Sequence, residues 1–586
     1  MDAPSGKTCK LFLKKYPTLY FLMISQLLSC EHSSDGSPFP SFPFKLGCTQ
    51  NFLSHSFPLA EPIFTHASNS TSLISNTKRR MDILLLSISL SLFSLFIFFH
   101  FLLRPYRRNL PPSPFFRLPL IGHLHLVKHP VHRTLHKLSH NYGHVFSLRY
   151  GSRLVVVVSS PSAVQECFTK NDIVLANRPL LKSGKFLAYN HTTLAVSPYG
   201  EHWRNLRRIS TLEIFSTSRL NLFLGIREDE VKNLLRKLRG DSLQEFRAVE
   251  LDSMLLDHTF NIVVRMIAGK KYYGEDLRDE GQSKKFREMV KEILANGGTA
   301  NLGDFVPLWN WIDPTGYEKR IMKIGERSDE LLQELVDEIR NQKDGGNTMI
   351  DHLLSLQNTQ PEYFSDQIIK GLAQILLLAG IDTAAITLEW ALSQLLNNPE
   401  VLKKARAEID HFIGEDRLVS EGDLSSLSYL QGVITETLRL NPAAPLLVPH
   451  CASEDCKIEG YDIPRDTIIL INAWAIHRDS NIWEDATSFK PERHANTMGG
   501  VDSYKLLPFG LGRRACPGMG MAQRVVGLTL ASLIQCFEWE RVNSSLVDMT
   551  EGEGLTMPKA QPLVAKCKPR PILKAILGVG GTIHNI

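Results

Sequence analysis

The sequence predicts a mainly helical protein with a small β region, preceded by a single N-terminal helix that spans a membrane. Apolar residues recur with helical periodicity over most of the chain after about residue 119. Only a few short runs have the alternation or the β-branched content of strands. Ahead of them, the run ILLLSISLSLFSLFIFFHFLL at residues 83–103 carries no formal charge and is long enough to cross a bilayer as a helix.

The composition is that of a large globular protein. With 586 residues, 43% of them hydrophobic, the chain can bury a sizeable core. Its 66 basic and 61 acidic residues leave a formal charge of +5, which is too small for a chain of this length to indicate nucleic-acid binding. Nine cysteines are scattered without regular spacing and without a CxxC pair, so a reducing compartment is the simpler interpretation.

The N-terminal part contains the membrane segment and an unusual extension. Residues 81–104 are predicted to be a membrane anchor, although a buried core helix or a signal peptide can carry a similar apolar run. The arginines in RPYRR, residues 104–108, place the C-terminal side in the cytosol by the positive-inside rule. Residues 1–80 end in three basic residues that compete with this signal, so we interpret them as an atypical extension, wrongly joined to the protein or processed.

The rest of the chain is predicted to form one domain. A Pro-rich stretch at residues 105–118 makes a stiff hinge after the anchor. The run HVFSLRYGSRLVVVVSS is predicted to be two strands joined at Tyr150-Gly151-Ser152, and TIILINAWAI is a further strand-like piece. We assign residues 119–568 to a single domain and residues 569–586 to a C-terminal tail.

The apolar segment IIKGLAQILLLAGIDTAAITLEWALSQLL is predicted to be a helix of about eight turns. Asp382 and Thr383 lie near its middle, where polar side chains are unfavourable unless they are hydrogen-bonded or used. Gly380 allows the helix to bend or a ligand to approach its backbone. The pair is therefore either functional, or a threonine bonded back to its own helix carbonyl beside an aspartate on a wet face.

Charged residues in two later segments form a candidate network. Glu436 and Arg439 in ETLRL lie one helical turn apart on the same face. Most such pairs are solvated and of small energetic value. Arg493, in the Pro-led loop FKPERH, can complete a buried network with them through bidentate bonds.

The loop LLPFGLGRRACPGMG, residues 506–520, holds one cysteine, Cys516, among arginines and glycines. A thiolate needs cations or backbone N–H donors nearby, and this loop offers both. A dinucleotide-binding turn fits poorly because the loop does not open a βαβ unit, and a catalytic nucleophile would need a partner histidine. A metal thiolate explains more of the loop, since Pro517 can start a helix whose dipole faces the sulfur.

Together these motifs resemble the cytochrome P-450 family. The stretch PFGLGRRACPG matches the family's haem-binding signature through Phe509, Gly512, Arg514, Cys516 and Gly518. AGIDT, the Glu–Arg pair, the PER loop and the cysteine loop also occur in the family's order, over roughly residues 103–568. The resemblance implies the cytochrome P-450 fold and a haem b, iron protoporphyrin IX, bound through Cys516 as axial thiolate ligand.

The resemblance implies further contacts to the haem. Arg514 is expected to pair with a propionate, as are Trp203 and Arg207 in EHWRNLRRIS. His450 stands where many relatives have an arginine that reaches a propionate, and it is expected to take that contact. The charged network is expected to support the fold near the haem, not to act in catalysis, and consists of Glu436, Arg439 and Arg493.

Asp382 and Thr383 resemble the family's acid–alcohol pair, which relays protons during the activation of dioxygen. Retention of Thr383 argues against the dehydratase and isomerase branches of the family. Two positions depart from the family pattern. Ala384 replaces the usual Thr or Ser, which weakens the relay assignment slightly, and His494 replaces the Phe that is common after PER.

The resemblance and the anchor together imply partners and a location. The chain contains no flavin or nicotinamide domain, so electrons are expected from NADPH through a separate NADPH-cytochrome P-450 reductase. We expect a single-pass protein of the endoplasmic reticulum membrane, with a cytosolic catalytic domain that takes dioxygen and a small aromatic substrate. A function of a different class stays open: a membrane haem protein that binds a ligand without turnover.

Several stretches resemble the plant microsomal branch that contains isoflavone hydroxylases and lignan- or indole-oxidising relatives, among them LPLIGHLHLVKHPVHRTLHKLSHNYG, NAWAIHRD and VVSSPSAVQECFTKNDIVLANRP. By analogy, the mostly apolar substrate pocket is expected to involve Phe186, Val196, Leu378, Ala379, Ala444, Leu447, Val448, Leu555 and Met557. Hydroxylation of an aromatic ring in an isoflavonoid- or flavonoid-like metabolite is the first expectation. Formation of a methylenedioxy bridge is the second, since likeness of fold does not choose a substrate.

Overall fold

The structure is a computed structural model that describes residues 81–97, 108–240, 245–271, 280–297, 301–313, 315–342, 346–495 and 504–576. Its contacts divide the chain into two units, with the boundary between Pro105 and Tyr106. In the first unit, Met81–Ile97 is an apolar helix with exposed apolar side chains, and it overlaps the start of the predicted anchor. The following parts of the predictions lie outside the described residues: the extension at 1–80, residues 98–104 of the anchor, residues 105–107 of the hinge and residues 577–586 of the tail.

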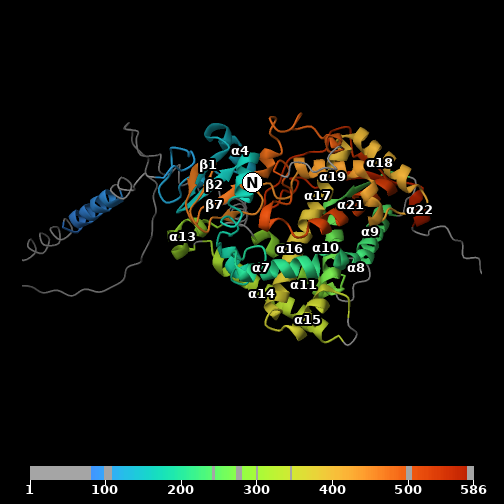
Figure 1. The fold of residues 1–586 in the computed structure, drawn as a ribbon, viewed down its shortest axis with the longest axis horizontal. Helices are drawn as coiled ribbons and strands as arrows, with labels where there is room; N and C mark the ends of the chain where they lie inside the picture. The colour runs from blue at the N-terminus through green and yellow to red at the C-terminus, as the bar shows by residue number, and fades with distance from the viewer. Residues whose placement is uncertain are drawn as a thin grey trace, which may run out of the picture. The chain divides into compact units, whose positions relative to one another are not determined.

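The second unit is mainly helical, as the sequence predicts (Figure 1). Its α-helices are α4 (Val131–Tyr142), α5 (Pro161–Phe168), α6 (Lys182–Leu187), α7 (Glu201–Ile209), α8 (Thr217–Leu222), α9 (Leu224–Arg239), α10 (Asp252–Ala268), α11 (Glu280–Asn296), α12 (Leu302–Phe305), α13 (Pro307–Ile312), α14 (Tyr317–Arg340), α15 (Met349–Thr359), α16 (Asp366–Gly380), α17 (Asp382–Asn397), α18 (Pro399–Ile413), α19 (Ser428–Leu440), α20 (Ala473–Ile476), α21 (Met519–Cys536) and α22 (Ile572–Ile576).

Strands within the described residues form three small sheets, with orders β1-β2-β7-β4, β3-β9-β8 and β5-β6. Their bounds are β1 (Val145–Tyr150), β2 (Arg153–Val158), β3 (Arg247–Glu250), β4 (His450–Cys451), β5 (Cys456–Ile458), β6 (Tyr461–Ile463), β7 (Ile468–Ile471), β8 (Phe537–Arg541) and β9 (Val564–Pro569).

The predicted strand pair is present, and the third predicted strand is present in part. β1 and β2 are antiparallel, with Tyr150 opposite Arg153, so the chain turns where the sequence indicates. In TIILINAWAI, only Ile468–Ile471 is a strand, and it pairs in parallel with β2. The Asn472 side chain accepts a hydrogen bond from the Ala475 N–H at 3.1 Å, and this cap begins helix α20 in place of further strand.

The long apolar segment is helical but interrupted. α16 ends at Gly380 and α17 begins at Asp382. A Cβ at Gly380 would lie 3.2 Å from Val263 Cγ2, so the glycine lets α10 approach closely at the break. Over the described residues, Asp366–Asn397 is the one helix long and apolar enough to cross a membrane, and 67% of its most apolar part is buried inside the protein. It is therefore the central helix of the core.

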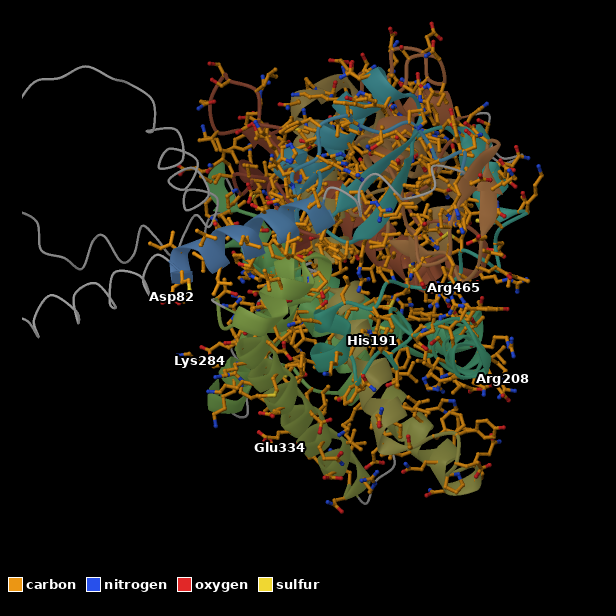
Figure 2. The ribbon with its side chains drawn as sticks, turned by 90° about the vertical axis from the view of Figure 1, so that its left-hand side faces the viewer. Asp82, His191, Arg208, Lys284, Glu334 and Arg465 are labelled. Atoms are coloured by element: carbon orange, nitrogen blue, oxygen red, sulfur yellow. The ribbon has the colours of Figure 1, made fainter. Side chains whose placement is uncertain are left out.

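The core brings four of these helices together. α10, α17 and α21 pack side by side in the middle of Figure 1, and α19 packs against both α17 and α21. Trp390 of α17 is fully buried, and its Nε1 donates to the Met557 carbonyl oxygen at 2.8 Å, which ties the central helix to a C-terminal loop. By contrast, Arg208 and Glu334, labelled in Figure 2, are exposed on their helices.

Candidate functional site

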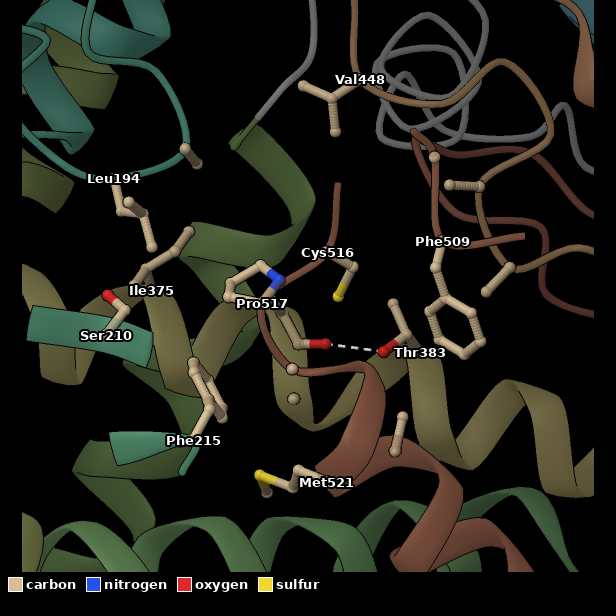
Figure 3. A pocket seen from close by; sticks show the side chains of 18 of the residues that line it. Leu194, Ser210, Phe215, Ile375, Thr383, Val448, Phe509, Cys516, Pro517 and Met521 are labelled. Atoms are coloured by element: carbon tan, nitrogen blue, oxygen red, sulfur yellow. Dashed lines mark hydrogen bonds between the residues drawn. The ribbon is translucent and has the colours of Figure 1, made fainter. Parts of the chain in front are cut away.

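The cysteine loop joins a 3₁₀ turn at Gly512–Arg514 to helix α21. The Cys516 amide donates to the Phe509 carbonyl oxygen at 2.9 Å, which folds the loop back on itself. Gly512 has a φ of +66°, and a Cβ there would lie 2.3 Å from Asp172 Oδ1, so this turn requires glycine. The loop presents the Cys516 sulfur just ahead of the first turn of α21 (Figure 3).

The Cys516 thiol has groups beside it that favour its ionised form. Burial raises the pKa of the thiol, whereas the Gly518 N–H and the Arg207 guanidinium lower it. The side chain is exposed because it faces a cavity, although protein surrounds it. A sulfur in this position can bind a soft metal ion that enters the cavity.

A mostly apolar cavity of about 320 Å³ lies against Cys516 (Figure 3). Its walls come from the α7 region, the break between α16 and α17, the chain before β4, and the cysteine loop with α21. Phe509 and Gly518 are part of this wall, and Gly512 is not. The apolar lining residues include Leu194, Ile214, Phe215, Ile375, Leu376, Ala379, Ala444, Leu447, Val448 and Met521.

Three arginines, Arg178, Arg207 and Arg514, line the same cavity. They donate to main-chain carbonyl oxygens, Arg178 to Val448 at 2.8 Å and Arg207 to Ala515 at 2.6 Å. In the part of the chain that the structure describes, no carboxylate pairs with any of them and no acidic residue lines the cavity. Burial lowers the pKa of Arg178 to about 9 and that of Arg514 to about 10, and a neighbouring arginine adds to each shift. Such a buried cationic cluster favours a bound anion.

This donor set fits a haem group. The thiol can ligate the iron, the guanidiniums can balance the two propionate charges, and the apolar walls can cover the porphyrin faces. The sequence predicts that Trp203 contacts a propionate directly, whereas in the structure it contacts Arg514. Its Nε1 donates to the Leu194 carbonyl oxygen at 3.2 Å, and the Arg514 guanidinium lies 4.3 Å from the centre of its ring. Trp203 therefore holds Arg514 by stacking, with its own N–H bound within the protein.

His450 lines the cavity, but its ring is poorly suited to bind a carboxylate in this state. Nδ1 lies 2.8 Å from the Leu175 carbonyl oxygen, to which it must donate. Burial and the nearby Arg178 hold the pKa of His450 well below its ordinary value, so the ring is neutral and Nε2 is only an acceptor. Arg178, which our sequence argument missed, supplies a cation at this place. It lies in a loop, LANRP, where no periodicity marks it.

Thr383 lines the cavity, and Asp382 does not. Thr383 Oγ1 donates to the Ala379 carbonyl oxygen at 2.6 Å, a bond back to its own helix that Figure 3 shows as a dashed line. Asp382 Oδ2 accepts a hydrogen bond from Thr556 Oγ1 at 2.7 Å. Burial raises the pKa of Asp382, and the Thr556 bond opposes that shift. The aspartate is thus half-buried against the C-terminal loop, not on a wet face.

Glu436, Arg439 and Arg493 form one buried network. Arg439 donates two bonds of 2.8 Å to Glu436, and Arg493 Nε donates a third at 3.0 Å. His494, which departs from the family pattern, joins them with Nε2 2.8 Å from Glu436 Oε2. Burial alone would raise the pKa of Glu436, but the bonds from Arg439 and His494 outweigh it and bring the pKa to about 2. These residues lie outside the cavity lining and connect α19 to the PER loop.

Some residues of the predicted substrate pocket line the cavity: Ala379, Ala444, Leu447 and Val448. Met557 does not, although its segment passes nearby. Its N–H donates to the Ala443 carbonyl oxygen at 2.9 Å, and its side chain is buried against Trp474. Only the main chain of Met557 therefore lies close to the residues before β4.

The other predicted pocket residues lie away from the cavity. Phe186 and Leu378 pack against the main core, and Leu555 is 47% exposed. Val196 is not in the lining, because its neighbours Leu194 and Ala195 provide that part of the wall. The loop that contains Val196 therefore reaches the cavity, but through the side chains of Leu194 and Ala195.

A helical fold that sets a cysteine and three unneutralised arginines around an apolar cavity defines a haem-thiolate protein. The sequence matches the family described as Cytochrome P450 over residues 111–565. The chain belongs to the cytochrome P450 family, and it is a monooxygenase of that family with a haem-thiolate cofactor.

Its similar relatives are plant proteins. Cytochrome P450 81Q32 of Catharanthus roseus is 57% identical over 499 residues, which cover 85% of this chain and 97% of the relative. Isoflavone 2'-hydroxylase of Glycyrrhiza echinata is 54% identical over 500 residues, or 85% of this chain and 99% of the relative. The (+)-piperitol/(+)-sesamin synthase CYP81Q2 of Sesamum radiatum is 51% identical over 470 residues, or 80% and 92%. The chain is therefore a plant P450 of the CYP81 group.

Solved structures share the fold. A zebra fish cytochrome P450 structure with progesterone has a TM-score of 0.65 at 24% identity, and the match covers 76% of this chain and 100% of that chain. The similarity supports the predicted cytochrome P-450 fold, with its long central helix and cysteine loop.

Proposed function

We propose that this protein hydroxylates an aromatic ring of a plant secondary metabolite of the isoflavonoid or flavonoid type. The observation that carries the proposal is the apolar cavity that Cys516 and Thr383 share, because its apolar lining near Thr383 offers an aromatic molecule a dry site next to a haem held by Cys516. The 54% identity to an isoflavone 2'-hydroxylase over nearly its whole length supports this choice of substrate class.

Cys516 would hold the haem iron through its thiolate, and the bound haem would supply the activation of dioxygen. The chain's own residues bind and orient the haem, exclude water and position the substrate. Arg178, Arg207 and Arg514 would balance the propionate charges and so fix the orientation of the group. The apolar walls, with Ile375 and Val448 among them, exclude water and position the substrate ring.

Thr383 Oγ1 is a hydroxyl at the break in the central helix, on the cavity wall, and it relays protons into the cavity. Its bond to the Ala379 carbonyl oxygen fixes the hydroxyl at the break in the central helix. Asp382 supplies the acid from the other side of the helix and must turn away from Thr556 to do so. Ala384, the next residue, is buried and has no hydroxyl, so Thr383 supplies the hydroxyl in this stretch of the helix.

The proposal includes a place and a partner. The apolar helix that begins at Met81 anchors the protein in the endoplasmic reticulum membrane by a single pass, with the catalytic domain in the cytosol. Electrons come from NADPH through the reductase of the same membrane.

A second candidate reaction is the closing of a methylenedioxy bridge in an ortho hydroxy-methoxy arene. The similarity to a piperitol and sesamin synthase, 51% identical, favours it specifically. In this reaction the methoxy carbon is oxidised and bonds to the neighbouring phenol oxygen, so the product has lost two hydrogens.

The test is turnover under labelled dioxygen. Membranes that contain the protein and a plant P450 reductase receive NADPH, ¹⁸O₂ and a panel of isoflavones, flavones and hydroxy-methoxy lignans. Hydroxylation is expected to add one labelled oxygen to an isoflavone or flavone. A product two hydrogens lighter and without label would select bridge formation instead. If neither product forms while the haem-thiolate spectrum is intact, the proposed substrate class is wrong.

A further inference from the structure

Helix α4 carries a histidine at every fourth position, at 132, 136 and 140. His132 is buried, and its Nε2 lies 2.7 Å from Glu551 Oε2, so this nitrogen is not open to a metal ion. His136 is half-buried, and His140 is exposed. Their Nε2 atoms face each other at 3.3 Å, on rings inclined by 67°. These two side chains lie outside the cavity lining and have no part in the mechanism above.

The separation of the two nitrogens matches that of two ligands on one tetrahedral metal ion. Imidazole nitrogens bind zinc at about 2.0–2.1 Å, and two such ligands at the tetrahedral angle lie about 3.3–3.4 Å apart. A spacing of four residues places both rings on one face of a helix, as in helical zinc sites that use two histidines. The backbone of α4 thus holds both nitrogens at the separation that the metal ion requires.

We propose that His136 and His140 form a bidentate surface site for a divalent transition-metal ion, Zn²⁺ in the first place, with water in the remaining positions. Imidazole is a ligand that suits Zn²⁺, Cu²⁺ and Ni²⁺, whereas Mg²⁺ and Ca²⁺ prefer oxygen. The site is independent of the proposed monooxygenase reaction and of the haem.

The surroundings of the pair set its strength. The Trp474 ring centre lies 5.5 Å from that of His136 and supports the imidazole from the core side. Asp479 acts on His136 as an opposite charge, while Arg478, stacked 4.3 Å over Trp474, opposes a bound cation. The described residues contain no cluster of three or more metal-ligating side chains. The affinity therefore rests on the two imidazoles.

The experiment measures zinc bound per haem iron. The full-length holoprotein, purified without a histidine tag, is dialysed against graded Zn²⁺, and metals are determined by atomic emission. The wild type is expected to bind one more zinc at saturation than His140→Ala. Because both ligands are needed for the chelate, His136→Ala should also bind one zinc fewer per haem iron than the wild type. The double variant should bind as much zinc as either single variant.

His411→Ala is the matched control, because His411 is an exposed histidine near the end of another helix, α18. It should bind zinc as the wild type does. His140 is exposed, so its variant should keep the reduced carbon-monoxide spectrum of the wild type, which separates this proposal from the haem assignment. Equal zinc stoichiometry and affinity in wild type and His140→Ala would overturn the proposal and leave the contact as a hydrogen bond between the two rings.

Discussion

Asp382 and Thr383 are adjacent in the chain but lie in different surroundings. The hydroxyl of Thr383 reaches the cavity wall, while the carboxylate of Asp382 is bound to Thr556, 174 residues away. The sequence pattern predicts the pair because two polar residues interrupt an apolar helix. It does not predict their orientation, since that depends on a loop distant in the sequence. In the proposed relay the hydroxyl of Thr383 is therefore fixed, and the acid, Asp382, is bound to Thr556.

Thr383→Ala is expected to keep the haem-thiolate spectrum and NADPH consumption but to lower product formed per NADPH by about ten-fold or more, because a general acid is lost. Product and NADPH measured in the same reaction test this. Ser393→Ala is the control, since Ser393 makes the same kind of bond back to its helix, at 2.8 Å to the Glu389 carbonyl, away from the cavity. Unchanged coupling in Thr383→Ala would remove the residue from the mechanism.

Thr556→Val tests the positioning of Asp382. Without the hydroxyl, burial acts unopposed and the pKa of Asp382 rises further, so the pH profile of coupling should move to higher pH. Thr556→Ser should restore the wild-type profile. Thr550→Val removes an exposed hydroxyl that is bound to Asp548, and it should change nothing. A profile that is identical in Thr556→Val and wild type would show that Thr556 does not act through Asp382.

Of the three arginines that line the cavity, two could be predicted from sequence patterns. Arg207 and Arg514 could be predicted, because one lies in a helical motif and the other beside Cys516. Arg178 could not, since its place at the cavity depends on carbonyl groups at Val448 and Pro449 that approach it only in the fold. His450 is the opposite case. Its position in the sequence indicates a cation, but burial keeps the ring neutral.

At the scale of elements, the two halves of the central helix, α16 and α17, have different roles. The break after Gly380 could be predicted from that glycine in an apolar run, and it opens the helix at the cavity. The length of α17 below the break is buried in the core, where Glu389 is 2% exposed and accepts a bond from the Leu563 N–H at 2.8 Å. Apolar periodicity did not mark Glu389 as a core residue, because the groups that compensate its charge, the Leu563 N–H and Lys559, come from near the end of the chain.

Glu389→Gln is expected to remove a pH dependence of stability. Burial, with Asp252 adding to it, raises the pKa of Glu389 to about 7 despite the Leu563 bond. Its contribution to stability is thus full below its unfolded pKa of about 4.3 and is lost as the pH rises through about 7. Wild-type thermal stability should fall between pH 5 and about 7.5 more steeply than that of the variant, whose amide keeps the bond. Parallel curves, followed by circular dichroism, would contradict the assignment.

For the whole molecule, the sequence predicts the fold class, the order of motifs and the cysteine loop, because each depends on local patterns. The strand pair at Tyr150 and the charged network at Glu436 follow the same logic. The cavity lining was predicted less well. Leu378 is apolar and adjacent in sequence to the lining residue Ala379, yet it packs against the core, as Phe186 does, and only packing between distant helices decides that.

The proposed membrane attachment concerns the whole chain. Deleting residues 81–103 is expected to release most of the protein from membranes into the soluble fraction, because the apolar helix that begins at Met81 is exposed along its length. Deleting residues 1–80 should leave the protein in the membrane fraction. Immunoblots of the separated fractions test both. Unchanged fractionation of the first variant would mean that another surface makes the main attachment.

The central claim is that Cys516 ligates haem as a thiolate. The most direct measurement is the reduced, carbon-monoxide-bound difference spectrum of membranes that contain the protein, with haem content assayed in parallel. The account predicts a strongly red-shifted Soret band in the wild type and its loss in Cys516→Ala. A wild-type band at the position of histidine-ligated haem, in protein that the assay finds loaded with haem, would contradict it.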